Sequence, residues 1–380
     1  MFNYIIVGAG LAGSVIAERI ASQLKEKVLI IERRKHIGGN CYDERDENGI
    51  LIHKYGPHIF HTNHKDVFQY LSMFTEWREY QHHVLGYIDG KLIPLPFNLN
   101  SIRKLFPQDL ASHLEKKLLK EYNFGERIPI LELMKHKDPQ IKFLADYIYN
   151  KVFVNYTRKQ WGLKPDEIHD SVTARVPVVL SKDNRYFTDK YQGVPKDGYT
   201  KMIKRMLNHP KIKIMLGTDH SEVLELKNGK IFFMGKEFKG KLIFTGKIDE
   251  LFNYRHGKLP YRSLDLQFET LDIEWFQKAA TINYPNDYDY TRITEFKHLH
   301  PVNTQKTVIV KEYPCNHIIG KNEPYYPMFT EDAQKKYLKY FKLSKSYKNL
   351  ILVGRLAEYR YYDMDDIVKK SLDTFKEMIK

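Results

Sequence analysis

The sequence NYIIVGAGLAGSVIAERIASQLKEKVLIIE, residues 3–32, decides the fold of this chain. Its first apolar run, Asn3–Val7, contains several β-branched residues and predicts a buried strand. Residues Ser14–Leu24 have the spacing of a helix, and Lys27–Ile31 is a second buried apolar run. A strand, a helix and a strand in this order predict a βαβ unit, and therefore a parallel sheet.

A GxGxxG motif lies between the first strand and the helix. Gly8 allows the tight turn, Gly10 allows the backbone to approach a diphosphate, and Gly13 allows helix and strand to pack closely. The unpaired N–H groups at the helix N-terminus attract an anion. Glu32 follows nineteen residues after the last glycine and can accept hydrogen bonds from ribose hydroxyls. The whole context favours dinucleotide binding over a merely structural glycine turn.

The next segment, Arg33–Asn40, refines the cofactor that we expect. It is a basic run followed by Gly38 and Gly39, and it suits backbone approach to a second part of a dinucleotide. A surface turn is the alternative interpretation. A glycine-rich segment at this point is less usual in NAD-type folds, so the sequence favours FAD.

The composition is that of a globular protein of more than one subdomain. The chain has 380 residues, 42% hydrophobic and 13% aromatic, and a formal net charge of +14. The charge allows a nucleic acid, an anionic membrane surface or an anionic small molecule as partner, or lysines simply scattered over the surface. We find no nucleic-acid-binding module beyond charge.

Cysteine content and apolar runs bear on location. Cys41 and Cys315 form neither a disulfide scaffold nor a metal-ligand cluster, which fits a reducing compartment. The N-terminus lacks the features of a signal peptide, and no run is long enough to insert into a membrane. We therefore predict a soluble, cytoplasmic protein.

The rest of the chain changes pattern twice. Residues from Asn100 to about Trp161 have helical spacing and predict a helical insertion. From Lys211 onward come short strand-like runs (KIKIML, KIFFM, KLIFTG, RSLDLQFET, AATINY, TRITEF and TVIVKEY), whose succession predicts an antiparallel sheet. Lys348–Val353 then predicts one more buried strand, and Asp365–Ile379 a final helix.

Several polar and aromatic segments are candidates for chemistry. His58, His61 and His64 stand three apart, but no cluster of carboxylate or cysteine ligands accompanies them, so we expect no metal site. They are structural histidines, or His61 lies beside a flavin ring. Tyr156 and Trp161 could stack on a base or a sugar, although a place in the core is the more usual one for such a pair.

Two later segments carry arginine. Tyr290–Glu295 and Lys311–Tyr313 resemble neighbouring strands whose Arg292 and Tyr313 could face a common cleft, with an Arg–Glu surface pair as the alternative. Gly354–Asp366 joins a buried strand to a helix and contains arginines, tyrosines and acids. Such a junction can bind an anion or a flavin carbonyl, and we favour a functional role for it.

Taken together, the motifs GAGLAGSVIAERI, IERRKHIGGNCYDE, HKYGPHIFHT, YTRKQWG, YTRITE, KEYP and GRLAEYRYYDMD closely resemble those of bacterial UDP-galactopyranose mutases. The likeness runs from the first strand to the last helix, and GPHIFHT, KQWG and RYxDMD are specific to that family. The resemblance implies an α/β fold: a Rossmann-like FAD-binding domain with an inserted helical bundle and a twisted antiparallel β-sheet domain. The implied boundaries are 1–80, 193–248 and 341–380 for the FAD domain, 99–165 for the bundle, and 81–98, 166–192 and 249–340 for the sheet domain, with a mobile loop near 166–180.

The resemblance also implies the reaction and the partners. It implies a homodimer with non-covalently held FAD that converts UDP-galactopyranose to UDP-galactofuranose for cell-surface glycans. The FAD is active when reduced, because its N5 attacks the anomeric carbon as UDP leaves. The reaction consumes no net electrons. Two alternatives remain: the same chemistry on UDP-N-acetylgalactosamine, and a conventional flavin oxidoreductase of the same superfamily.

Site residues follow from the matching motif positions. Implied at FAD are Gly8, Gly10, Ala12, Gly13, Glu32, Arg33, Gly39, Asn40, His58, Ile59, Arg355, Asp363 and Met364. Implied at the substrate are Tyr156, Trp161, Tyr186, Asn283, Tyr313 and Tyr361, and the catalytic set is Arg175, Arg292 and His61.

One position departs from the family pattern. Lys258 stands where many members have an arginine that supports activity, and lysine keeps the charge but loses the bidentate fork. We leave open whether Arg255 or Arg262 compensates.

Overall fold

A five-stranded parallel sheet organises one end of the molecule. The computed structural model describes residues 2–162 and 177–379. The sheet order is β12 (Ile212–Leu216), β2 (Val28–Glu32), β1 (Tyr4–Val7), β16 (Lys241–Phe244) and β22 (Leu350–Leu352). Every neighbouring pair is parallel. The predicted Rossmann-like half is therefore confirmed.

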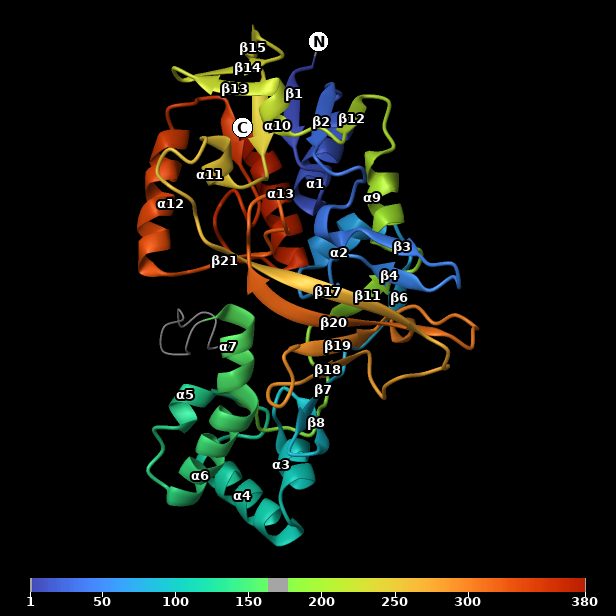
Figure 1. Ribbon diagram of the computed structural model, residues 1–380, viewed down its shortest axis with the longest axis vertical. Helices are drawn as coiled ribbons and strands as arrows, with labels where there is room; N and C mark the ends of the chain where they lie inside the picture. Colours follow the sequence, from blue (N-terminus) through green and yellow to red (C-terminus); the bar gives the residue numbers. More distant parts are fainter. Residues whose placement is uncertain (1, 163–176, 380) are drawn as a thin grey trace.

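Helices cover both faces of this sheet (Figure 1). One face packs against α1 (Leu11–Arg19), α9 (Tyr199–Leu207) and α13 (Met364–Met378). The other packs against α11 (Ile248–Leu251) and α12 (Glu331–Ser344). Side chains alternate between the two cores, as strand geometry requires: Ile6 and Ile30 face the first, and Ile5 and Leu29 the second.

The predicted first helix begins earlier than expected and ends irregularly. It starts at Leu11, and residues Ile20–Leu24 form a π-helical turn that ends at Lys25 with φ of 57°. Its buried side is lined by small residues such as Ala12 and Ala17, so the helix lies close to the sheet.

The prediction that all runs after Lys211 form one antiparallel sheet is wrong for two of them. The runs that became β12 and β16 lie in the parallel sheet, beside β2 and β1 respectively. Between them the chain forms a small antiparallel meander of β13 (Leu224–Lys227), β14 (Lys230–Phe233) and β15 (Lys236–Glu237). Helix α9 precedes β12, and its crossover returns the chain in the parallel direction.

A larger sheet crosses the middle of the molecule. Its order is β21 (Tyr326–Pro327), β17 (Tyr261–Leu271), β20 (Thr307–Asn316), β19 (Arg292–Glu295), β18 (Thr281–Asn283), β7 (Val84–Ile88) and β8 (Lys91–Leu95). Only β18 and β7 pair in parallel; the other pairs are antiparallel. The antiparallel prediction is thus confirmed for the later runs.

A helical region occupies the opposite end (Figure 1). It contains α3 (Leu99–Leu105), α4 (Gln108–Glu121), α5 (Ile130–Leu133), α6 (Pro139–Ile148), a π-helix (Tyr149–Val154) and α7 (Asn155–Trp161). Polar side chains start the helices: Asn98 accepts from the N–H groups of Asn100 and Ser101, and Asp138 caps α6. Short strands β9 (Arg127–Pro129) and β10 (Pro177–Val179) pair beside it.

Smaller elements join these parts. Strands β5 (Phe60–Thr62), β11 (Tyr191–Pro195) and β6 (Trp77–Glu79) form an antiparallel sheet, and β3 (Asp43–Arg45) pairs with β4 (Leu51–His53). Short helices are α2 (Lys65–Ser72), α10 (His220–Val223), and the 3₁₀ turns Gly39–Cys41 and Phe296–His298.

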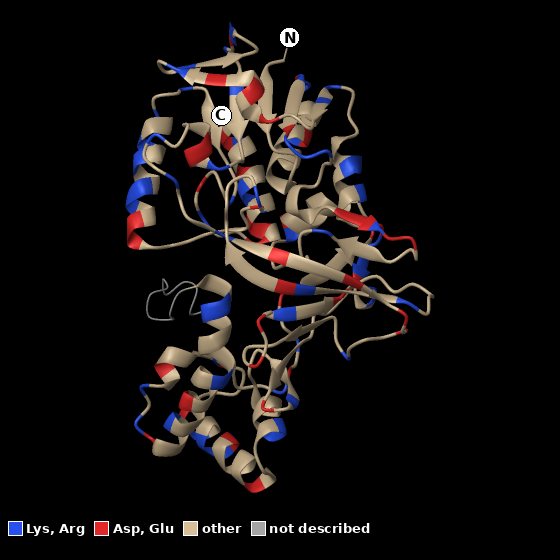
Figure 2. Cartoon of the chain, viewed as in Figure 1, with Lys and Arg blue, Asp and Glu red and all other residues tan. Residues whose placement is uncertain are grey.

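The positive charge has no single location. Lysine and arginine side chains are distributed over the parallel sheet, the central sheet and the helical end alike (Figure 2). Within the described part of the chain, no helix combines the length and the apolar character that a membrane crossing requires.

Candidate functional site

A cavity opens at the carboxyl edge of the parallel sheet, where α1 begins. Of the thirteen residues predicted at the cofactor, eleven line it: Gly8, Gly10, Ala12, Glu32, Arg33, Gly39, Asn40, His58, Arg355, Asp363 and Met364. Gly13 lies behind the lining, and Ile59 packs against the core around Phe296. This is the edge at which open parallel α/β sheets bind ligands.

The glycines shape the floor of this cavity. Gly8 has φ of 105°, which favours glycine, and a Cβ on Gly13 would lie 2.0 Å from the carbonyl oxygen of Gly8. Gly39 has φ of 55°, and its Cβ would lie 2.8 Å from the Cα of Gly10. A Cβ on Gly10 would find no protein atom nearer than 3.7 Å. The glycines thus form a cradle in which a diphosphate can approach the backbone.

Glu32 is held at the end of β2 by backbone donors. Its side chain is buried, with Oε2 accepting from the N–H of Ala9 at 2.8 Å and Oε1 from the N–H of Arg34 at 2.9 Å. A carboxylate has lone pairs left for further donors. Its place in the lining fits a ribose at this end of the cavity, so the residues present suit a dinucleotide.

Two cavity segments were missed in the sequence. Thr218–His220 follows β12, and Thr245–Lys247 follows β16. Both lie at the carboxyl ends of parallel strands, so the rule that locates ligands at this edge would have found them. The antiparallel interpretation of these runs concealed them.

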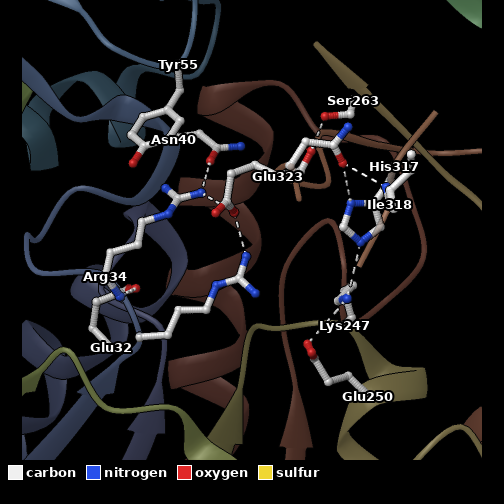
Figure 3. A network of polar contacts seen from close by, with 12 residues as sticks. Glu32, Arg34, Asn40, Tyr55, Lys247, Glu250, Ser263, His317, Ile318 and Glu323 are labelled. Carbon is white, nitrogen blue, oxygen red and sulfur yellow. Dashed lines mark hydrogen bonds and ion pairs between the residues drawn. The ribbon is translucent and has the colours of Figure 1, made fainter. Parts of the chain in front are cut away.

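A polar network includes Arg34, Asn40 and Lys247, which line the cavity (Figure 3). Nη2 of Arg34 lies 3.0 Å from Oδ1 of Asn40, and its guanidinium lies 4.1 Å from the ring centre of Tyr55. Nearby, Nζ of Lys247 lies 3.3 Å from Nε2 of His317. These contacts place several cations around a cavity suited to an anionic ligand.

His58 lies where the cavity meets the central sheet. Burial lowers its pKa to about 4, with smaller contributions from the charges of Arg355 and Arg292. Its Nδ1 lies 2.8 Å from the carbonyl oxygen of Gly56, so Nδ1 carries the proton and Nε2 can accept a hydrogen bond.

His61 has different surroundings. Its Nδ1 lies 3.1 Å from Oδ2 of Asp189, and its ring stacks on Phe187 with centroids 3.6 Å apart. It is not among the residues that line the cavity. In the described part of the chain, no group of three His, Cys, Asp or Glu side chains is arranged to hold a metal ion.

A second, smaller pocket lies between α7 and β18. Tyr156, Tyr186 and Asn283 line it together, so three of the predicted substrate residues meet here. Oδ1 of Asn283 is buried and has no hydrogen-bond partner within residues 2–162 and 177–379. An unpaired buried oxygen at this position can accept a ligand donor.

Arg292 stands beside this pocket in a row across three strands. Asn283, Arg292 and Glu312 are directly opposite one another on β18, β19 and β20, so all three face one side of the sheet. Nε of Arg292 lies 2.7 Å from Oε1 of Glu312, which is buried. Burial alone lowers the pKa of Arg292, but the charge of Glu312, its hydrogen bond with Arg292 and the nearby tyrosines, chiefly Tyr156, together outweigh burial, so the net pKa is raised.

Tyr156 is close to the same charges. Burial raises the pKa of Tyr156, and Arg292 opposes this shift. Its hydroxyl therefore remains protonated and can donate a hydrogen bond at neutral pH.

An aromatic group lies next to Arg355 of the first cavity. Tyr326 stacks on Tyr361 with ring centroids 5.9 Å apart, and Trp161 lies 6.0 Å from Tyr326. The Arg355 guanidinium, which also lines the first cavity, lies 5.3 Å from Tyr326 and 5.0 Å from Tyr361. Trp161 and Tyr361 were predicted at the substrate, whereas Tyr326 was missed. Its sequence context, Tyr-Tyr-Pro, matches no motif that would mark it as a binding residue.

The remaining predicted residues are placed as follows. Tyr313 follows Glu312, so it faces the other side of the sheet, where its ring meets Tyr290 at 5.8 Å. The structure does not bring it together with Arg292. Arg175 lies outside the described residues.

Lys258 and Arg262 have different surroundings. Lys258 is exposed, with its ammonium 5.9 Å from the ring of Tyr254. Arg262 is buried and donates to the carbonyl oxygens of Lys159 at 2.9 Å and Gln160 at 3.0 Å, at the end of α7. Its guanidinium thus holds the helix that carries Tyr156 and Trp161.

Buried histidines near the site predict a pH-dependent stability. Burial lowers the pKa of His58 and His300 to about 4 and that of His82 to about 3. Because the unfolded chain binds these protons near pH 6.5, stability should fall as pH drops from about 6.5 towards 4, by up to about 1.4 kcal/mol per pH unit for each histidine. In urea unfolding at a series of pH values, the free energy of unfolding of His300→Leu should fall less steeply with decreasing pH than that of the wild type. The variant His83→Leu, at an exposed histidine, should show the same slope as the wild type. Equal slopes in all three would contradict this.

Comparisons with known proteins agree with this geometry. A family model described as UDP-galactopyranose mutase matches residues 151–361, and one described as an NAD(P)-binding Rossmann-like domain matches residues 6–74. The chain is 36% identical to a dTDP-fucopyranose mutase of Escherichia coli, covering 100% of this chain and 99% of that protein. It is also 36% identical to a probable UDP-galactopyranose mutase of Klebsiella pneumoniae, covering 99% and 94%.

The fold comparison points the same way. A crystal structure of reduced UDP-galactopyranose mutase superposes with a TM-score of 0.74 at 16% identity, covering 100% of this chain and 94% of that one. The family model spans more than half of this chain, and the sequence relatives match it over nearly its whole length. The chain therefore belongs to the UDP-galactopyranose mutase family.

Proposed function

We propose that this protein interconverts UDP-galactopyranose and UDP-galactofuranose, with reduced FAD in the cavity at the parallel sheet. The observation that carries the proposal is that one cation acts on both pockets: the charge of Arg292 acts on His58, which lines the first cavity, and on Tyr156, which lines the second. One pocket suits a dinucleotide, and the other gathers Tyr156 and Asn283 beside a fixed cation. A nucleotide-sugar that reaches from one to the other would lie against both.

The chain's own residues supply binding and charge stabilisation. When bound, reduced FAD supplies a nucleophilic nitrogen for the anomeric carbon. Arg292 can stabilise the charge that develops on the diphosphate as the glycosidic bond breaks. The Tyr156 hydroxyl can donate to substrate, and the Asn283 oxygen can accept from it. Arg175 is proposed to add a second cation.

Other features of the proposal come from the family and the sequence. We propose Gly8, Gly10, Ala12, Glu32, Asn40, Asp363 and Met364 as FAD contacts, a homodimeric and cytoplasmic enzyme, and a role in supplying galactofuranose for surface glycans. We also propose the division into an FAD domain, a helical bundle and a sheet domain at the boundaries stated above.

The substrate sugar is the point at which the family divides. One relative is named for dTDP-fucopyranose, which lacks the 6-hydroxyl of galactose and carries thymine in place of uracil. This favours dTDP-fucopyranose as a second candidate. UDP-N-acetylgalactosamine is a third.

An anaerobic assay decides between these substrates. Dithionite-reduced protein is incubated with each of the three pyranose nucleotides, and the furanose products are separated and quantified. We expect UDP-galactofuranose to form with the highest kcat/KM and with no net consumption of reductant. A preference for either other sugar would replace the proposed substrate, and stoichiometric flavin oxidation without furanose would indicate an oxidoreductase instead.

A further inference from the structure

The segment 317–325 connects β20 to β21 and forms part of the cavity wall. Pro324 and Tyr325 of this segment line the cavity. The segment belongs to the central sheet, whereas most of the lining comes from the parallel sheet. It is therefore a place where the two halves of the molecule meet across the bound ligand.

The carboxylate of Glu323 connects this segment to the parallel-sheet half of the molecule. Oε2 of Glu323 lies 2.5 Å from Nη2 of Arg33. The same oxygen lies 2.8 Å from Nη2 of Arg34 (Figure 3). Both arginines follow directly on Glu32 and line the cavity. The Glu323 side chain is 32% exposed, and those of Arg33 and Arg34 are 37% and 13% exposed. Water and salt therefore reach the pair, so it can open.

The base of the segment is fixed independently of that carboxylate. Ser263, which is fully buried, donates through Oγ to the carbonyl oxygen of Glu323 at 2.6 Å. The N–H of Tyr325 donates to the carbonyl oxygen of Arg262 at 2.9 Å, and Arg355 donates to that of Tyr325 at 3.2 Å. Loss of the Glu323 charge should thus release the arginines without unfolding the segment.

We propose that Glu323 is a positioning residue that latches the β20–β21 segment to Arg33 and Arg34 and so slows the release of the dinucleotide. The inference rests on one part of the proposed function, the binding of FAD in this cavity. It deepens that proposal because it names what retains the cofactor. Two guanidinium groups on one carboxylate hold the wall closed at the ribose end, beside Glu32, and the ligand leaves when the latch opens.

The physical character of the latch predicts its salt dependence. The Arg33–Glu323 pair is exposed and is screened by salt, the Arg34–Glu323 pair is partly buried and is screened less, and the buried backbone contacts of the cradle are not screened. Release of FAD should therefore accelerate with ionic strength in the wild type. Glu323→Gln keeps the size of the side chain and removes its charge. It should release FAD about 10-fold faster at low salt and with little further acceleration at high salt.

The test follows FAD release by fluorescence after the loaded protein is mixed with an excess of an apo-flavoprotein trap, at low and high sodium chloride. Glu269→Gln is the matched control, because Glu269 pairs with Lys311 at 3.0 Å on the same sheet but does not line the cavity. Unchanged release in Glu323→Gln, or equal acceleration in Glu269→Gln, would overturn the latch.

Two further measurements separate the possible causes. Melting of the apo form should be the same in Glu323→Gln and wild type, and a large decrease would mean a general structural role and overturn the inference. Because release is read without substrate, the latch is tested whatever sugar the enzyme uses. A wild-type protein that binds no FAD would instead contradict the proposed function, and the latch with it.

Discussion

Arg292→Ala is expected to lower kcat for furanose formation by about 1000-fold and to leave FAD bound. Removal of a positioned charge that stabilises a developing anion costs on the order of 10²–10³ in rate, and a full cation on a leaving diphosphate lies at the upper end. Arg292 lies opposite Asn283 and its charge acts on Tyr156, both of which line the second pocket, and it is not among the residues that line the dinucleotide cavity. Turnover should therefore be lost while the flavin spectrum is kept.

Because Arg292 pairs with Glu312, the Arg292→Ala variant can also lose stability, and a second variant controls for this loss. Arg292→Ala leaves the buried Glu312 carboxylate without its cation, which costs about 3–5 kcal/mol in comparable buried pairs. Arg292→Lys retains the charge and the pairing but loses the planar fork. We expect it to melt near wild type and to lose roughly 10- to 100-fold in kcat.

Anaerobic turnover with reduced flavin, read beside urea unfolding, checks both variants. Near-wild-type turnover in Arg292→Ala with reduced flavin would show that the guanidinium does not act on the substrate. A loss of activity that merely tracks unfolding would show that its role is structural. Activity lost in Arg292→Lys at normal stability would confirm that the fork itself matters.

The nucleotide-binding half could be predicted because its chemistry is local in sequence. Gly8, Gly10, Gly13 and Glu32 lie within one βαβ unit, and the close approach that requires glycine at position 13 is to the carbonyl oxygen of Gly8 in the same unit. The cavity lining at Thr218 and Thr245 was not foreseen, since it depends on which strands become neighbours. That order is set by crossovers through α9 and the meander, and no short window of sequence contains it.

The substrate side shows a different limit. The sequence suggested that Arg292 and Tyr313 face a common cleft, with an Arg–Glu pair as the alternative, and the structure pairs Arg292 with Glu312. Neighbouring residues on a strand face opposite sides of the sheet, and the sequence did not show which of Glu312 and Tyr313 lies on the side of Arg292. The sequence likewise did not distinguish the roles of Arg262 and Lys258. Only the fold shows that Arg262 is buried against α7 and that Lys258 is exposed.

Gly10→Ala is expected to yield a folded protein that has lost most of its FAD. Gly10 has φ of −78°, which any residue adopts, and a Cβ there meets no atom of the protein nearer than 3.7 Å. The added methyl group instead occupies the cradle where the diphosphate would approach the helix N-terminus. Overpacking of this kind costs about 1–3 kcal/mol, so FAD affinity should fall by up to about 100-fold.

Gly13→Ala is the matched variant because it adds the same methyl group three residues further along α1. Its Cβ would lie 2.0 Å from the carbonyl oxygen of Gly8 and 3.1 Å from Ile6, so helix and strand must separate. We expect insoluble protein or a much lower melting temperature, whereas apo Gly10→Ala should melt as the wild-type apo protein does. The flavin-to-protein absorbance ratio and apo melting curves compare the two. Full flavin content in Gly10→Ala would mean that the diphosphate does not lie at this cradle, and a low apo melting temperature in Gly10→Ala would mean that Gly10, like Gly13, is required by the fold instead of the ligand.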